Sequence, residues 1–207
     1  MTYLQNRFGK KVIAKDTFDV SQIKYICGVD VSYKRGIAYC SAVIINKDTF
    51  ETIELANSKT PVWHPYIPGL FALREFRPVL TTLKLLKQPF EILLINGHGM
   101  LHPRKCGLAC SVGLMIDKPT IGVAKGLLCG FVRADQFIEY NNQVLGFRFK
   151  KGMTKQIYIS VGNRITLMTS VKIVKNLIKE GEWMPEPLRL ADTNSKNQSN
   201  FKYPFTS

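Results

Sequence analysis

The 207-residue sequence predicts a mixed α/β domain in which an antiparallel meander of strands is followed by alternating helices and strands. Short segments of strand-like composition occupy the region up to residue 56, and segments with helical apolar spacing then alternate with buried strand-like runs. Apolar residues make up 45% of the chain and charged residues 21%, which is typical of one globular domain with a single core.

The meander is predicted from three segments near the start of the chain. Residues 25–33 (YICGVDVSY) and 38–46 (AYCSAVIIN) have the composition of strands, and Lys34-Arg35-Gly36 between them is typical of a turn. Residues 51–56 can form the third strand. The chain therefore begins with consecutive, antiparallel strands.

Helices and buried strands alternate after the meander. Apolar residues recur at helical spacing over 69–88, and residues 104–116 are a glycine-interrupted helix. The runs EILLIN (91–96) and PTIGVA (119–124) are apolar enough for buried strands. The remaining predicted elements are strands at 144–149 and 156–161 and a helix at 166–179 with Thr166 as its N-cap.

The chain is predicted to form one domain over residues 1–192, followed by a flexible polar tail at 193–207. After Pro185 the composition changes to Asn, Ser and Lys, which bury too little apolar surface to hold a structure. The order of elements is that of a ribonuclease H-like mixed sheet with helices on both faces, although other mixed α/β folds share it.

The charge balance predicts an anionic partner. Twenty-nine Lys and Arg against 15 Asp and Glu give a formal net charge of +14. Nucleic acid is the first candidate, because neutralisation of phosphates by Lys and Arg supplies most of the non-specific binding energy. The alternative is that all proteins of the source organism have a basic isoelectric point.

The sequence also bears on location. No apolar run reaches the roughly 20 residues of a membrane-spanning helix, and the start lacks the apolar core of a signal peptide. We expect a cytoplasmic monomer without a membrane partner, or a nuclear or nucleolar one in a eukaryote.

The cysteines predict buried, reduced thiols. They are odd in number and lie mostly in apolar segments, which argues against a disulfide framework. Their positions are Cys27, Cys40, Cys106, Cys110 and Cys129.

Four residues at a regular spacing have side chains that commonly bind zinc, namely His98, His102, Cys106 and Cys110. Their spacing of four requires a continuous helix, and glycine and proline interrupt one here. A zinc-binding interaction module is therefore kept as an alternative, beside the interpretation of Cys106 and Cys110 as small core residues.

Polar groups at strand ends are the candidates for chemistry. Asp30 lies inside an apolar strand, where an unpaired carboxylate is costly unless a metal ion or a basic side chain satisfies it. Asn96 and Lys125 follow two buried strands, and open α/β sheets usually bind ligands at such ends. Glu75 lies on the apolar helix, where most glutamates are solvated. With Asp30 it can hold a divalent cation that neutralises a phosphate and activates water.

The proline-bracketed segment around Tyr66 has two interpretations. Pro65-Tyr66-Ile67-Pro68 can be a rigid surface turn that packs the aromatic ring onto the core. It can also present Tyr66 as a wedge that stacks against bases, because every base offers a face for stacking.

Several motifs together resemble the endonuclease V family in order and spacing. The match extends over roughly residues 4–192, and independent motifs in the right order are far more specific than any one alone. The motifs are GVDVSY (28–33), PYIPGL (65–70) running into Arg74-Glu75, Gly97-His98-Gly99 with His102-Pro103-Arg104, IGVAK (121–125) and PEPLRLAD (185–192).

The resemblance implies a ribonuclease H-like endonuclease. Such an enzyme binds DNA or RNA containing hypoxanthine, which is deaminated adenine, and hydrolyses a phosphodiester on the 3′ side of the lesion with Mg²⁺, or with Mn²⁺ in its place. By position, Asp30, Glu75 and Asn96 match the family's metal site. His102 and Lys125 match residues around the scissile phosphate.

The resemblance also implies a recognition site. Tyr66 matches the family's wedge, and Gly69, Leu70 and Gly97 match the backbone that lines the pocket for the flipped base. The same motifs make Pro65 and Arg104 further candidates for contact with nucleic acid. Extruding a base is cheapest when the base is mispaired, which gives a physical source of lesion preference.

Two positions depart from the family pattern. Asn96 stands where the family has an aspartate, and Asn163 where it has a histidine after a glycine. Asn96 offers a carbonyl oxygen but no negative charge. Even the loss of a group that only hydrogen-bonds to a metal ligand typically costs about 10- to 100-fold in metal affinity or activity. A weakened or re-tuned endonuclease is therefore the first hypothesis, and a non-catalytic paralogue that binds inosine is the second.

Overall fold

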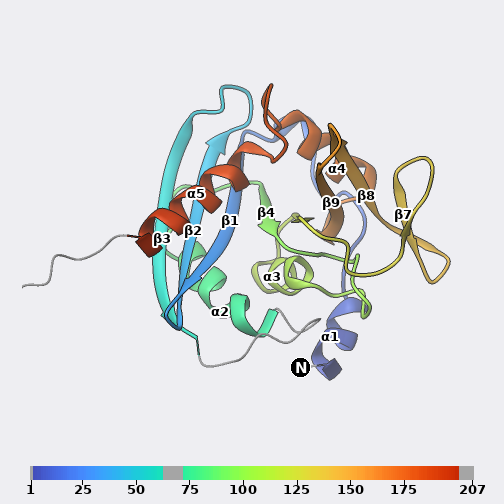
Figure 1. The fold of residues 1–207 in the computed structure, drawn as a ribbon, viewed down its shortest axis with the longest axis horizontal. Coiled ribbons are helices and arrows are strands. Elements are labelled where there is room, and N and C mark those ends of the chain that lie inside the picture. Colours follow the sequence, from blue (N-terminus) through green and yellow to red (C-terminus); the bar gives the residue numbers. More distant parts are fainter. Residues whose placement is uncertain (1, 63–71, 201–207) are drawn as a thin grey trace, which may run out of the picture.

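A computed structural model describes residues 2–62 and 72–200 of the chain (Figure 1). The described residues form a single mixed sheet of nine strands. In chain order the strands are β1 (Tyr25–Lys34), β2 (Ile37–Asn46), β3 (Thr52–Pro61), β4 (Ile92–Asn96), β5 (Thr120–Ala124), β6 (Phe131–Val132), β7 (Phe137–Tyr140), β8 (Gln143–Lys151) and β9 (Lys155–Asn163).

The sheet has the order β3-β2-β1-β4-β5-β9-β8-β7-β6. β1, β2 and β3 form the predicted antiparallel meander, and β4 and β5 continue it in parallel with β1. The turn between β1 and β2 is confirmed, because Arg35 and Gly36 have φ of 48° and 76°, as a tight hairpin turn requires. The observed topology is the ribonuclease H-like arrangement that the sequence predicts.

Helices cover both faces of the sheet. They are α1 (Thr2–Gly9), the short 3-10 helix η1 (Val20–Gln22), α2 (Ala72–Leu83), α3 (Leu108–Ile116), α4 (Leu167–Asn176) and α5 (Glu186–Asn200). Alternate residues of β1 enter two different cores. Ile26 packs with side chains of α4 and α5, whereas Cys27 and Val29 pack with those of α2 and α3. Figure 1 shows α5 lying across β1 and β2.

Most predicted elements are confirmed, with shifted ends. β3 extends to Pro61, five residues beyond the predicted strand, because it pairs with β2 along its whole length. α3 begins at Leu108 and not at residue 104, since Gly107 precedes it with extended backbone. Thr166 caps α4 as predicted, accepting a hydrogen bond from Thr169 N at 3.2 Å. Helix α1 and strands β6 and β7 were not predicted.

The prediction of a flexible tail from residue 193 is wrong for residues 193–200, which continue helix α5. Ser195 is fully buried, and Ser32 Oγ of β1 donates a hydrogen bond to its carbonyl oxygen at 2.7 Å. Packing against the sheet thus overrides the weak helix propensity of Asn and Ser. The rest of the predicted tail, residues 201–207, lies outside the described residues.

All five cysteines are free, and four of them are buried, as the sequence predicts. Cys129 is partly exposed. None of the helices formed by the described residues is long and apolar enough to cross a membrane.

Gly28 controls how closely α5 approaches β1. A Cβ at Gly28 would lie 2.4 Å from the carbonyl carbon of Pro187, a backbone atom that cannot move aside. We predict that Gly28→Ala lowers the free energy of unfolding by about 1–3 kcal/mol, through overpacking at this contact. Urea denaturation measures the effect. Gly126→Ala is the matched control, since a Cβ there meets open space; equal denaturation midpoints for both variants would contradict the prediction.

Candidate functional site

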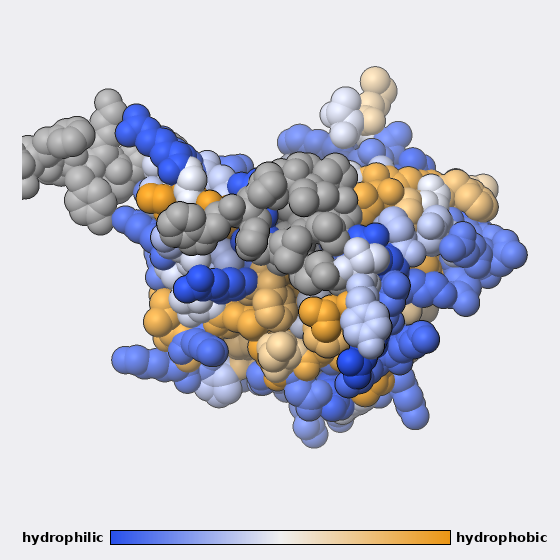
Figure 2. Space-filling view, turned by 90° about the horizontal axis from the view of Figure 1, so that it is seen from below, coloured by the Kyte–Doolittle hydropathy of each residue, from blue (hydrophilic) through white to orange (hydrophobic). Residues whose placement is uncertain are grey.

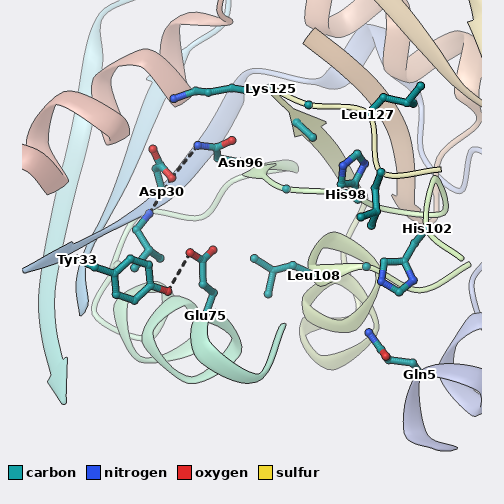
Figure 3. A pocket seen from close by; sticks show the side chains of 16 residues that line it. Gln5, Asp30, Tyr33, Glu75, Asn96, His98, His102, Leu108, Lys125 and Leu127 are labelled. Carbon is teal, nitrogen blue, oxygen red and sulfur yellow. Dashed lines mark hydrogen bonds between the residues drawn. The ribbon is translucent and has the colours of Figure 1, made fainter. Parts of the chain in front are cut away.

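A cavity of about 510 Å³ lies at the carboxyl ends of β4 and β5 (Figure 3). Asp30 of β1, Glu75 of α2 and Asn96 of β4 line it, together with Lys125 directly after β5. The predicted metal-site residues, which come from segments far apart in the sequence, thus share one cavity. Gln5 of α1 also contributes to the wall, and nothing in the sequence singled it out.

Asp30 is a buried carboxyl held by hydrogen bonds from its neighbours. It is 6% exposed, and its Oδ1 accepts hydrogen bonds from Val31 N at 2.8 Å and from Asn96 Nδ2 at 2.9 Å. Burial raises the pKa of Asp30 to about 7, with a further rise from its hydrogen bond to Asp192. The hydrogen bonds around Asp30 therefore do not fully stabilise its negative charge.

Glu75 faces inward because of its place on α2. Val79 and Thr82 follow at helical spacing and are buried on the same face, so Glu75 points to the sheet and is 2% exposed. Its Oε1 accepts a hydrogen bond from Tyr33 OH at 2.9 Å, and the guanidinium of Arg74 lies 4.3 Å from the Tyr33 ring centroid. Burial raises the pKa of Glu75 well above its usual range. Glu75 is thus a second buried carboxyl in the same cavity.

Asp192 of α5 is a carboxyl of the site to which sequence reasoning gave no role. It accepts hydrogen bonds from Lys125 Nζ at 3.0 Å and Lys196 Nζ at 2.6 Å. Burial opposes ionisation of Asp192, but the hydrogen bonds from Lys196, Asp30 and Lys125 lower its pKa below the usual range. The available signal was its position as the last residue of the motif PEPLRLAD, in a segment interpreted as the approach to a tail.

Two histidines line the inner wall. His102 is 3% exposed, and its Nδ1 accepts a hydrogen bond from Arg104 N at 3.2 Å, which leaves the proton of the neutral ring on Nε2. Among the described residues, no group forms a hydrogen bond with the buried Nδ1 atom of His98. Burial lowers the pKa of His98 to about 4, and the proximity of His102 lowers it further. His98 is therefore neutral near pH 7.

The structure describes two of the residues predicted to contact nucleic acid, Gly97 and Arg104. Gly97 lines the cavity. Arg104 contacts the protein itself, because its Nε donates a hydrogen bond to Gln5 Oε1 at 2.7 Å. The other predicted contacts, Pro65, Tyr66, Gly69 and Leu70, lie outside the described residues.

The four residues of the zinc alternative do not converge. Cys106 Sγ lies 3.5 Å from Ser111 Oγ, and Cys110 Sγ lies 3.6 Å from the Val161 carbonyl oxygen, inside the core. Across residues 2–62 and 72–200, no three His, Cys, Asp or Glu side chains are grouped in a way that could hold a metal ion. Cys106 and Cys110 have the role of small core residues.

Asn163, the second departure from the family pattern, does not line the cavity. It is 1% exposed and pairs with Thr120 at the beginning of β5, whereas the cavity lies at the end of that strand. Its Oδ1 accepts a hydrogen bond from Ile13 N, and its Nδ2 donates one to the Gly113 carbonyl oxygen, each at 3.2 Å. Asn163 therefore joins backbone segments and contacts no cavity group.

Residues 6–193 match the family model described as Endonuclease V. The chain belongs to the endonuclease V family. It is 40% identical over 192 residues to Endonuclease V of Thermofilum pendens, covering 90% of this chain and 82% of that protein. It is 38% identical over 195 residues to the Pyrococcus abyssi protein, covering 94% and 89%.

The fold is also that of solved endonuclease V structures. Ciona intestinalis Endonuclease V, crystallised with a 24mer DNA containing an inosine followed by a ribo-adenosine, superposes with a TM-score of 0.86 at 28% identity. The match covers 95% of this chain and 94% of that one. Sequence, topology and cavity thus agree on one family.

The raised pKa of Asp30 makes stability depend on pH. Its folded pKa of about 7 exceeds the unfolded value of 3.8, so the stabilisation is complete below pH 3.8 and is lost as pH rises through 7. We predict that, in EDTA, the free energy of unfolding falls less between pH 4 and pH 8 in Asp30→Asn than in the parent protein, by on the order of 2–4 kcal/mol. Urea denaturation of both proteins across that range measures it. Parallel pH profiles would show that Asp30 ionises as an ordinary carboxyl.

Proposed function

We propose that the chain is a metal-dependent endonuclease that recognises hypoxanthine in DNA or RNA and hydrolyses a phosphodiester on its 3′ side. The observation that carries the proposal is the cavity of an endonuclease V-family fold in which Asp30, Glu75 and Asn96 come together from three elements. A relative of the same fold binds DNA containing inosine.

The cavity groups fit a divalent cation by their chemistry. Asp30 and Glu75 are buried carboxyls whose ionisation is unfavourable, and an added cation would compensate that charge. Carboxylate and amide oxygens are the ligands that Mg²⁺ prefers, and Mn²⁺ accepts the same donors. We propose Asp30, Glu75 and the carbonyl oxygen of Asn96 as the groups that would hold it. Such a cation neutralises phosphate charge and lowers the pKa of bound water.

Lys125 and His102 are proposed to act on the phosphate. The Lys125 side chain is 43% exposed, so its ammonium can turn from Asp192 to a phosphate oxygen at the cavity mouth. His102, with its proton on Nε2, can donate a hydrogen bond to an oxygen of the scissile group. Both roles require only small movements of side chains already in place.

Recognition is proposed to depend on groups other than the carboxyls. Gly97 offers backbone close to the cavity, and Tyr66 would separate the bases as a wedge. On the face shown in Figure 2, apolar side chains gather centrally and hydrophilic ones surround them. This distribution, with the net charge of +14, suits a ligand that has a charged backbone and stacked bases.

A non-catalytic protein that binds inosine is the second candidate, and one observation favours it. Asn96 Nδ2 donates a hydrogen bond to Asp30, so an N–H group faces the carboxyl where a cation would otherwise lie. The proposed base recognition makes no demand on that cation. Binding can therefore persist without hydrolysis.

Restoring a carboxylate at position 96 tests the metal site under both candidates, and cleavage by the parent protein in the same assay separates them. Asn96→Asp should raise affinity for Mn²⁺ and Mg²⁺ and increase or create cleavage of inosine-containing DNA and RNA, by about 10- to 100-fold or more. Calorimetry and gel-based cleavage assays measure these effects. Asn57→Asp on the exposed side of β3 is the control for added charge. A folded Asn96→Asp variant that binds no more metal and cuts no faster would show that position 96 is not a metal-site position.

Recognition is tested separately in EDTA. Tyr66→Ala should weaken binding to inosine-containing strands by about 1–3 kcal/mol, because the ring would no longer stack on a base. Tyr3→Ala is the control, since Tyr3 is an exposed tyrosine on α1. Fluorescence anisotropy with matched strands measures affinity. Unchanged affinity would favour the interpretation of Tyr66 as part of a surface turn.

A further inference from the structure

Asn96 is followed by Gly97, and no other asparagine in the 207-residue sequence precedes a glycine. Deamidation is fastest in Asn-Gly pairs, because glycine has no side chain to hinder its backbone nitrogen as it attacks the amide carbon. The product is a carboxylate at the same position. This sequence therefore places the most reactive asparagine where the family pattern has an aspartate.

We propose that Asn96 is a deamidation site and that its conversion to aspartate completes the carboxylate set of the cavity. The inference rests on the proposed function, since metal-dependent hydrolysis is what needs the added carboxylate. It would convert a cavity that contains an amide beside Asp30 into one with a further carboxylate, without a change in the gene.

The reaction is balanced with water as its sole co-reactant. Gly97 N attacks Cγ of Asn96, a C–N bond forms, and the Cγ–Nδ2 bond breaks to close a cyclic imide. The proton lost from Gly97 N leaves with Nδ2 as ammonia. Water then opens the imide and returns a proton to Gly97 N, which gives aspartate, or isoaspartate when the other C–N bond is cleaved.

The end of β4 allows this attack after a small local opening. Asn96 is the last residue of β4, and its pairing with Val123 is the last step of the β4–β5 register. In the closed state Gly97 N donates to the Val123 carbonyl oxygen at 3.0 Å. This terminal hydrogen bond must open, and the Asn96 side chain must turn away from Asp30, which strand ends allow at low free energy. The cavity, which Asn96 and Gly97 both line, admits the water.

The contact between Asn96 and Asp30 explains why deamidation would change cation binding. Asn96 Nδ2 now donates to Asp30 Oδ1 at 2.9 Å. Replacing that amide with a carboxylate puts two acidic groups at hydrogen-bond distance, which is unfavourable unless a cation lies between them. The product therefore binds a divalent cation more tightly than the parent amide does.

Ageing of the purified full-length protein in EDTA tests the proposal. Samples are digested in heavy-oxygen water, which marks deamidation that occurs during digestion, and position 96 is followed by mass spectrometry. We expect the Asn96 peptide to convert to aspartate, at least several-fold faster than the peptide containing exposed Asn57-Ser58. Mn²⁺ binding should rise in proportion to the aspartate fraction.

Two variants control the chemistry. Gly97→Ala should slow the conversion several-fold and still fold, because a Cβ there meets Leu108 at an ordinary 3.6 Å. Asn96→Gln keeps an amide at the position and should gain no Mn²⁺ affinity with age.

The proposal is overturned if position 96 stays an amide in the folded protein while urea-unfolded protein converts under the same conditions. It is equally overturned if isoaspartate alone forms and Mn²⁺ affinity does not rise. The Asn96→Asp variant, assayed without ageing, tests the proposed function independently. Its inactivity would contradict that function, whereas its activity beside a stable Asn96 would contradict deamidation alone.

Discussion

The site depends on hydrogen-bond and charge partners that stabilise the carboxyl groups where β1, β4 and α5 meet. A buried carboxylate is costly without a partner, and each one here takes a partner from another element. The Asn96 amide donates to Asp30, the Tyr33 hydroxyl donates to Glu75, and Lys125 pairs with Asp192. These contacts join the strands to α2 and α5, so the geometry of the site and the packing of the sheet are established together.

The approach of α5 to β1 completes this arrangement. Gly28 leaves no Cβ between β1 and Pro187, and Ser32 bonds to the backbone at Ser195. Between these two contacts the helix runs along the strand, which brings Asp192 close enough to Asp30 to raise the pKa of Asp30. A glycine in the strand therefore determines where a carboxyl of a distant helix lies. Close backbone contact and catalytic geometry are two results of one packing constraint.

The sequence predicts the parts of this structure that apolar patterning controls. The strands containing Asp30 and Asn96 are apolar runs, so both their burial and the polar residues at their ends could be recognised. Asp192 could not, because α5 has a polar composition and is helical only through its packing on the sheet. The pairing of Arg104 with Gln5 was equally out of reach, since it joins residues 99 positions apart. Tertiary contact decides such cases, and local sequence does not encode it.

The two departures from the family pattern have different physical meanings. Asn163 bonds to backbone at the far end of β5, whereas Asn96 lines the cavity and contacts Asp30. The remaining acidic groups also favour an enzyme over a binding protein. Buried carboxyls with raised pKa values, such as Asp30 and Glu75, reduce stability near neutral pH unless a cation compensates them. A protein that merely bound a base would be more stable with neutral residues at both positions, so the two carboxyls agree with the metal-dependent reaction proposed above.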